Sequence, residues 1–152
     1  MKLSDLFRAE NVVVDLPAAG KPELLEAIVR DLDSRNEIRD VEHTIKDVVE
    51  RERVMSTGIG NGVAIPHAYT DGVDHLVAGF YRTAEGVDFE ALDNNVVDLF
   101  FIILGPKESR RDHIKVLAKI SRLLNHEDFR EDLRNAPDAD AVMGVFRRFG
   151  DK

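Results

Sequence analysis

The chain contains one nine-residue run that is apolar at every position except one: Val96-Val97-Asp98-Leu99-Phe100-Phe101-Ile102-Ile103-Leu104. A strand without alternating polar residues is covered on both of its faces, so this run predicts a central strand of a sheet. The turn-forming residues Asp93-Asn94-Asn95 precede the run, and Gly105-Pro106 ends it. The other elements are therefore expected to cover this strand from both sides.

The remaining elements are predicted from the period of their apolar residues and from their capping residues. Further strands are expected at 11–16, 63–65 and 76–82. After a short helix at 3–8, helices are expected after Gly20-Lys21-Pro22, after the caps Asp40, Ser109 and Asp138, and around 129–133. From the first strand onward the order is β-α-α-β-β-β-α-α-α. It predicts an α/β fold with helices on both faces of a mixed sheet. No repeat or linker divides the chain, so a single domain over 1–152 is expected.

The composition limits the classes of function. Of 152 residues, 43% are hydrophobic and 33% are charged, as in a globular domain. The absence of cysteine excludes disulfides, thiol nucleophiles and cysteine-based zinc sites. A net charge of −8 argues against binding to nucleic acid or to an anionic membrane. No signal peptide and no apolar run of the roughly 20 residues that span a membrane is found, so the cytoplasm is the expected compartment.

A second stretch indicates the chemistry: Ser56-Thr57-Gly58-Ile59-Gly60-Asn61-Gly62-Val63-Ala64-Ile65-Pro66-His67. Glycine permits close backbone approach, and proline restricts the backbone before the histidine. The Ser56 and Thr57 hydroxyls and the amides around Gly58 and Gly60 can bind phosphate oxygens, although no Walker A pattern is present. Imidazole can accept a phosphoryl group and pass it on. The stretch therefore predicts phosphoryl chemistry on His67.

Two more residues are candidates for the same site. His113 shares the inward face of its predicted helix with Val116 and Leu117, and the positive end of the helix dipole favours its neutral form. A neutral ring there can orient a second imidazole or contact its phosphate. Arg51 lies beside the apolar stripe of the Asp40 helix, where a guanidinium can clamp phosphate oxygens. By composition alone, Arg53 is an equal alternative.

The other three histidines, His43, His75 and His126, lie in polar surroundings and are interpreted as surface residues. No metal-ligand spacing such as His-x-x-x-His is present, and no metal or organic cofactor is predicted. A histidine-dependent hydrolase is a weaker alternative, because the sequence offers no convincing set of nucleophile, base and acid beyond the histidines.

These residues match a known family. The segments Arg51-Glu52, Ser56 to Ala68, Val87 to Asn94, Val97-Asp98-Leu99 and His113 to Leu124 closely resemble the IIA domain of the phosphoenolpyruvate-dependent phosphotransferase system, mannitol/fructose class. The resemblance covers nearly the whole chain. It implies a three-layer α/β/α sandwich, a phosphorylated histidine at His67, a second active-site histidine at His113 and a phosphate-contacting arginine at Arg51 rather than Arg53. One modest departure is Ile114, where many members have leucine.

The resemblance also implies partners. The phosphoryl donor would be the phosphocarrier HPr, in its sugar-transport or nitrogen version, and the acceptor in transporting members is a separate IIB domain. The residues around Asn61 and Phe89-Glu90-Ala91-Leu92 look more like the nitrogen-regulatory branch than like a sugar-transport IIA. A regulatory target protein is therefore a second kind of partner. An apolar rim that includes Ile59, Val63 and Ile65 is expected to support docking.

Overall fold

The apolar run forms the centre of a six-stranded sheet in the computed structural model, which describes residues 2–151. It becomes β6 (Val97–Gly105), in which every residue except Asp98 is buried. β6 pairs with one antiparallel neighbour, β5 (Val77–Val87), and with two parallel ones, β3 (Val63–Ala64) and β4 (His67–Tyr69). The predicted central strand is confirmed.

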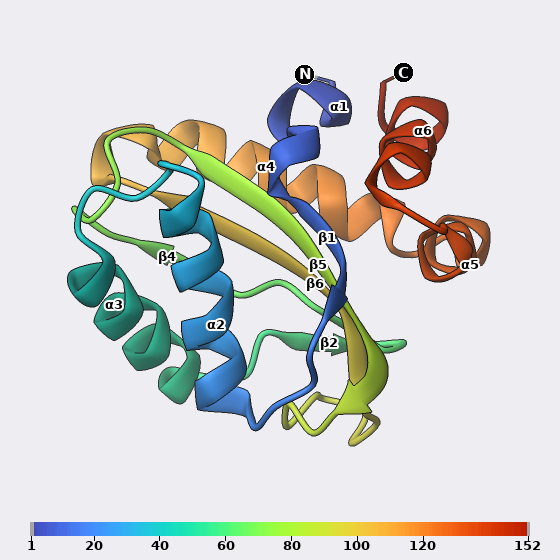
Figure 1. Cartoon of the computed structure of the whole chain (residues 1–152), viewed down its shortest axis with the longest axis horizontal. Helices are drawn as coiled ribbons and strands as arrows, with labels where there is room; N and C mark the ends of the chain where they lie inside the picture. Colours follow the sequence, from blue (N-terminus) through green and yellow to red (C-terminus); the bar gives the residue numbers. More distant parts are fainter. Residues whose placement is uncertain (1, 152) are drawn as a thin grey trace.

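The order of the strands is β1-β5-β6-β3-β2, with β4 also on β6. In Figure 1, β1, β5 and β6 run side by side. β1 (Val12–Leu16) is parallel to β5, and β2 (Gly58–Gly60) is antiparallel to β3. Along one edge of β6, Val63 lies opposite Leu99 and His67 lies opposite Ile103. The carbonyl of Pro66 accepts a hydrogen bond from the Ile103 amide at 3.0 Å, so contact with β6 continues between β3 and β4.

Helices cover both faces of this sheet, and their bounds are α1 (Leu3–Leu6), α2 (Lys21–Ser34), α3 (Val41–Val54), α4 (Arg110–Leu123), α5 (Glu127–Asn135) and α6 (Ala139–Gly150), with 3-10 turns at Ala9–Asn11 and Lys107–Ser109. In Figure 1, α2 and α3 lie on one side of the sheet and α4 on the other. Phe100 and Ile102 of β6 pack in the core beneath α2 and α3, whereas Phe101 packs against the other helices. This alternation confirms the α/β/α sandwich.

The helix ends follow the predicted caps in two of three cases. The side chain of Asp40 accepts a hydrogen bond from the His43 amide, and that of Asp138 accepts one from Ala141. Ser109 is different, because a 3-10 turn precedes α4 and its hydroxyl donates to the Pro106 carbonyl instead. The prediction of a Ser109 side-chain cap is wrong.

No helix within residues 2–151 is both long and apolar enough to cross a membrane.

Two strands were not predicted, β2 and β4, and the first belongs to a tight hairpin. Its turn is Asn61-Gly62, and both residues have positive φ, 58° and 77°. A type I′ turn requires positive φ at both central positions and favours Asn-Gly, so this dipeptide was the available signal. β4 contains only three residues and follows a proline, so it has no alternating pattern to detect.

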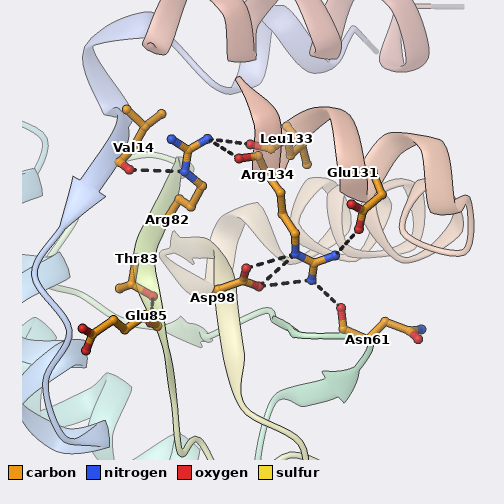
Figure 2. A network of polar contacts seen from close by, with 9 residues as sticks. All are labelled: Val14, Asn61, Arg82, Thr83, Glu85, Asp98, Glu131, Leu133 and Arg134. Atoms are coloured by element: carbon orange, nitrogen blue, oxygen red, sulfur yellow. Dashed lines mark hydrogen bonds and ion pairs between the residues drawn. The ribbon is translucent and has the colours of Figure 1, made fainter. Parts of the chain in front are cut away.

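Figure 2 shows how this hairpin turn is held by a helix far away in the sequence. Arg134 of α5 donates to the Asn61 carbonyl at 2.6 Å and forms an ion pair with Asp98 of β6 at 3.0 Å. Arg82 of β5 donates to the carbonyls of Leu133 and Ala136 at 2.8 and 2.7 Å, which satisfies carbonyls at the end of α5. Arg134 therefore joins the turn before β3 and the central strand to α5, and Arg82 joins β5 to the end of the same helix.

Candidate active site

His67 is the first residue of β4, and its ring is half-buried. Nδ1 lies 2.7 Å from the carbonyl oxygen of Ile65, and Nε2 lies 3.4 Å from Nη2 of Arg51. A carbonyl oxygen can only accept and a guanidinium can only donate, so the hydrogen-bond network assigns the ring proton to Nδ1. Nε2 therefore presents its lone pair toward the guanidinium. The positive charge of Arg51 would offset the negative charge of an anionic electrophile that approaches Nε2.

The surroundings also keep this ring neutral. Burial lowers the pKa of His67 below its usual value of 6.5, and the charge of Arg51 acts in the same direction. The hydrogen bond to Ile65 and the charge of Glu52 oppose this shift. Because the net direction is downward, the unprotonated form of His67 is the main form at neutral pH.

The guanidinium beside His67 belongs to Arg51, in the last turn of α3. Its Nη1 donates to the Met55 carbonyl at 3.1 Å, just beyond the end of the helix, while Nη2 faces the imidazole. The two Nη atoms of one planar guanidinium thus bridge the end of the helix and the histidine. Arg53 is exposed and makes no such contact, so of the two arginines it is Arg51 that lies beside His67.

His113 of α4 is fully buried beside His67, with the two ring centroids 5.8 Å apart. Neither of its ring nitrogens has a hydrogen-bond partner among residues 2–151. Burial, and then the neighbouring His67, lower the pKa of His113 to about 4. The expected neutral form therefore results mainly from burial. A buried polar group without a partner costs about 1–3 kcal/mol, so this ring reduces stability where it stands.

Tyr69 was missed in the sequence and lies two residues after His67 along β4. Its ring centroid is 4.6 Å from that of His113, and the guanidinium carbon of Arg110 lies 5.4 Å from the centroid of the tyrosine ring. Residues at i and i+2 of a strand share a face, so recognition of β4 would have placed Tyr69 beside His67. The second histidine is thus enclosed between aromatic side chains.

The loop from Ser56 to Gly60 lies next to Arg51, and its side chains are engaged within the chain. The Ser56 hydroxyl donates to the Phe89 carbonyl and accepts from the Gly58 amide, while the Thr57 hydroxyl and amide both donate to Glu52. Gly58 is buried so close to Ala91 that a Cβ would collide with it, and Gly60 has φ of 101°. The predicted phosphate contacts of these four residues stay predictions.

The apolar rim differs from the expectation. Ile59 is exposed, but Val63 and Ile65 are buried because they lie in and beside β3, so including them in the rim is wrong. Three other exposed apolar side chains lie near Ser56: Val54, Met55 and Leu92, at 83%, 65% and 71%. They line a groove of about 640 Å³ that reaches Ser56.

The remaining histidines lie at the surface, as predicted. His43 contacts Asp47, and His75 contacts Glu37. Among the described residues, no three histidine or carboxylate side chains gather as a metal-binding group would. The chemically distinctive cluster of the molecule is therefore the one formed by Arg51, His67 and His113, which can receive an anionic electrophile at Nε2 of His67.

Comparison with known proteins gives one family match and several relatives. Residues 5–148 match the model of the phosphoenolpyruvate-dependent sugar phosphotransferase system, EIIA 2. The fructose-specific EIIA component of Haloferax volcanii is 35% identical over 143 residues, which cover 94% of this chain and 93% of that protein. The nitrogen regulatory protein of Pseudomonas aeruginosa is 32% identical over 145 residues, covering 95% and 94% of the two chains.

Solved structures show the same fold. The crystal structure of the nitrogen regulatory protein IIA-Ntr from Neisseria meningitidis has a TM-score of 0.87 and 30% identity, covering 95% of this chain and 98% of its own. Enzyme IIA for mannitol from Escherichia coli, solved in complex with its phosphorylated enzyme IIB, has a TM-score of 0.78 and 23% identity, covering 92% and 96%. Relatives of both the regulatory and the sugar-specific kind therefore share this architecture.

Proposed function

Because this chain belongs to the EIIA 2 family of the phosphoenolpyruvate-dependent sugar phosphotransferase system, we propose that His67 is the residue that accepts its phosphoryl group. The chain is a IIA phosphocarrier domain, of the nitrogen-regulatory or of the sugar-specific type. One observation carries the choice of residue. Nε2 of His67 carries no proton, and its lone pair faces the guanidinium of Arg51 at 3.4 Å.

The proposed reaction is in-line transfer from a phosphohistidine on HPr. Nε2 of His67 attacks the phosphorus, an Nε2–P bond forms, and the N–P bond of the donor breaks, returning its electron pair to the donor imidazole. The Nδ1 proton of His67 stays in place, and the Ile65 carbonyl faces the positive charge that develops on the ring. Such a transfer depends on positioning and on electrostatic stabilisation of the phosphoryl oxygens.

Arg51 and His113 have distinct roles in this proposal. Arg51 neutralises the equatorial oxygens, because its fork already faces Nε2. His113 donates from a ring nitrogen to a phosphoryl oxygen, which would supply the partner that its buried ring lacks. Ser56, Thr57, Gly58 and Gly60 complete the phosphate surroundings in this proposal. The two hydroxyls and the Thr57 and Gly58 amides already donate within the chain, so any of these donors that contacts the phosphoryl group would exchange its present partner for a phosphoryl oxygen. The proposal uses no metal and no organic cofactor.

The partners follow from the same proposal. The donor is HPr or its nitrogen-type counterpart, and the cytoplasm is the compartment in which they would meet. For a sugar-specific IIA the acceptor is a separate IIB domain, as in the mannitol complex from Escherichia coli. For a regulatory IIA, phosphorylation adds a dianionic group to a chain of net charge −8 and changes its affinity for a target protein. We favour the regulatory reading on the sequence around Asn61 and Phe89.

The test is incubation of the protein with phosphoenolpyruvate, enzyme I and HPr. Wild-type protein should gain one acid-labile phosphate, His67→Ala should gain none, and His75→Ala at the surface should behave as wild type. Labelling of His67→Ala at the wild-type rate would show that another residue is the acceptor. Onward transfer to an added IIB distinguishes the sugar-specific type, and phosphorylation-sensitive capture of a target without such transfer distinguishes the regulatory type. Turnover of a phosphoester without HPr would instead favour a hydrolase.

A further inference from the structure

One carboxylate near the site is buried and has no part in the mechanism above. Glu52 is 5% exposed, although it belongs to the charged run Glu50-Arg51-Glu52-Arg53. Its carboxylate accepts from the Thr57 amide at 2.8 Å and from the Thr57 hydroxyl at 2.6 Å, and it pairs with Nζ of Lys21 at 2.9 Å. Both carboxylate oxygens of Glu52 therefore have hydrogen-bond or ion-pair partners, as a buried charge requires.

These contacts lead directly to the reacting histidine. Glu52 holds Thr57, and the Thr57 carbonyl accepts from the Ile65 amide at 3.0 Å. The Ile65 carbonyl in turn accepts from Nδ1 of His67 at 2.7 Å. The carbonyl that sets the His67 tautomer is thus held in place by a residue that Glu52 anchors.

The same carboxylate lies next to the base of Arg51. The two residues are adjacent in the last turn of α3, and Arg51 reaches Met55 while Glu52 reaches Thr57. Both ends of the three-residue segment after α3 are therefore tied back to the helix. Lys21 adds α2 to the assembly and is itself enclosed, with Nζ 4.6 Å from the centre of the Phe89 ring.

We propose that Glu52 is a positioning residue for phosphoryl transfer: with Lys21 and Thr57 it fixes the loop that orients His67, and its negative charge favours the cationic ring formed when Nε2 bonds phosphorus. Among residues 2–151, the charged or titratable groups that face His67 are otherwise the cation Arg51 of α3 and the neutral His113 of α4. Lys21 of α2 pairs with Glu52 and offsets part of its charge, so the effect on His67 is what remains. Glu52 does not touch the reacting atoms. The inference rests on the proposed function of His67.

The deciding variant is Glu52→Gln, which keeps the size and lets the amide oxygen accept from Thr57, but removes the charge. We expect the maximal rate of phosphorylation by phospho-HPr to fall about tenfold through misplacement of the ring, while KM for HPr stays unchanged because the carboxylate lies beneath the surface. Glu52 raises the pKa of His67, so its loss should move the acid limb of the pH–rate profile to lower pH. Simple loosening of the site would admit water and move that limb upward, toward 6.5.

Two further variants control the experiment. Glu90→Gln also removes a carboxylate near Lys21, at 3.8 Å, but Glu90 is exposed, so rate and pH profile should match wild type. If Glu52→Gln does not fold by circular dichroism, Lys21→Gln carries the test, because an unpaired Glu52 should move the acid limb above 6.5, whereas loosening of the site can move it only up to 6.5. An unchanged rate and an unchanged limb in the folded variant would overturn the role of Glu52. Failure of wild-type protein to be labelled on His67 would instead overturn the proposed function.

Discussion

Replacement of His113 by leucine should make the protein more stable while it impairs the site. The wild-type ring buries two nitrogens without a partner among the described residues, and removal of such a group relieves about 1–3 kcal/mol. Leucine has nearly the same volume, and imperfect packing costs less than about 1.5 kcal/mol. We therefore expect His113→Leu to raise the free energy of unfolding by about 1 kcal/mol at pH 7.

The gain should grow as the pH falls. His113 has a pKa of about 4 in the folded protein and near 6.5 when unfolded, so between these values only the unfolded wild-type chain binds the proton. The contribution that neutral His113 makes to the free energy of unfolding is fully present above pH 6.5, and it is lost as the pH falls toward 4. By linkage, the difference between leucine variant and wild type widens by about 2 kcal/mol from pH 7 to pH 5.

Urea unfolding followed by circular dichroism at both pH values measures this difference. The carboxylates are the same in both proteins, so their pH-dependent contributions to the free energy of unfolding cancel when the two are subtracted. His126→Leu, at an exposed position, shows the effect of losing a solvent-facing histidine. A leucine variant that is less stable than wild type at pH 7, or a difference that stays constant down to pH 5, would refute the reasoning. Labelling by phospho-HPr measures the loss of function in the same preparation.

Three further outcomes are expected. Arg51→Lys cannot bridge Met55 and His67 with one planar fork, so quench-flow should show labelling about 100-fold slower, and a loss below threefold would contradict this role. The wild-type labelling rate should stay constant from pH 8 to below 6.5 and fall only at lower pH, since burial and Arg51 lower the pKa of His67; a midpoint at or above 6.5 would be inconsistent with the site. Gly62→Ala places a methyl group against the Arg134 guanidinium, at a residue with φ of 77°. It should lower the free energy of unfolding, measured by urea unfolding, by about 1–3 kcal/mol. Gly144→Ala is the control, because its methyl group would enter open space and should cause no loss.

The features that the sequence predicted are those with a local signal. The β6 run is apolar throughout, Asp40 and Asp138 stand directly before their helices, and the histidine follows a glycine-rich loop and a proline. The family resemblance then favoured Arg51 over Arg53, and Arg51 is the one that lies beside His67.

The features that escaped prediction depend on residues far apart in the chain. Glu52 looks like one charge among four, and only the approach of Lys21 and Thr57 buries it. Val63 looked like a candidate for an exposed rim until its pairing with Leu99 placed it inside the sheet. No local pattern contains such information, because burial of a short segment is decided by its distant neighbours.

The mixed pairing of β6 has a consequence for how the chain folds. β5 and β6 meet across a short connection, with Val87 opposite Val97, whereas His67 reaches Ile103 only after a separation of 36 residues in the chain. Closing a long loop costs conformational entropy before the contacts that it brings together add any favourable free energy. Local antiparallel strand pairs therefore form sooner than distant parallel ones. We expect the β5–β6 ribbon to form early and β4 to join it late. A nascent or partly folded chain would then lack the assembled histidine, and would neither take phosphate from the donor nor compete for it with finished molecules.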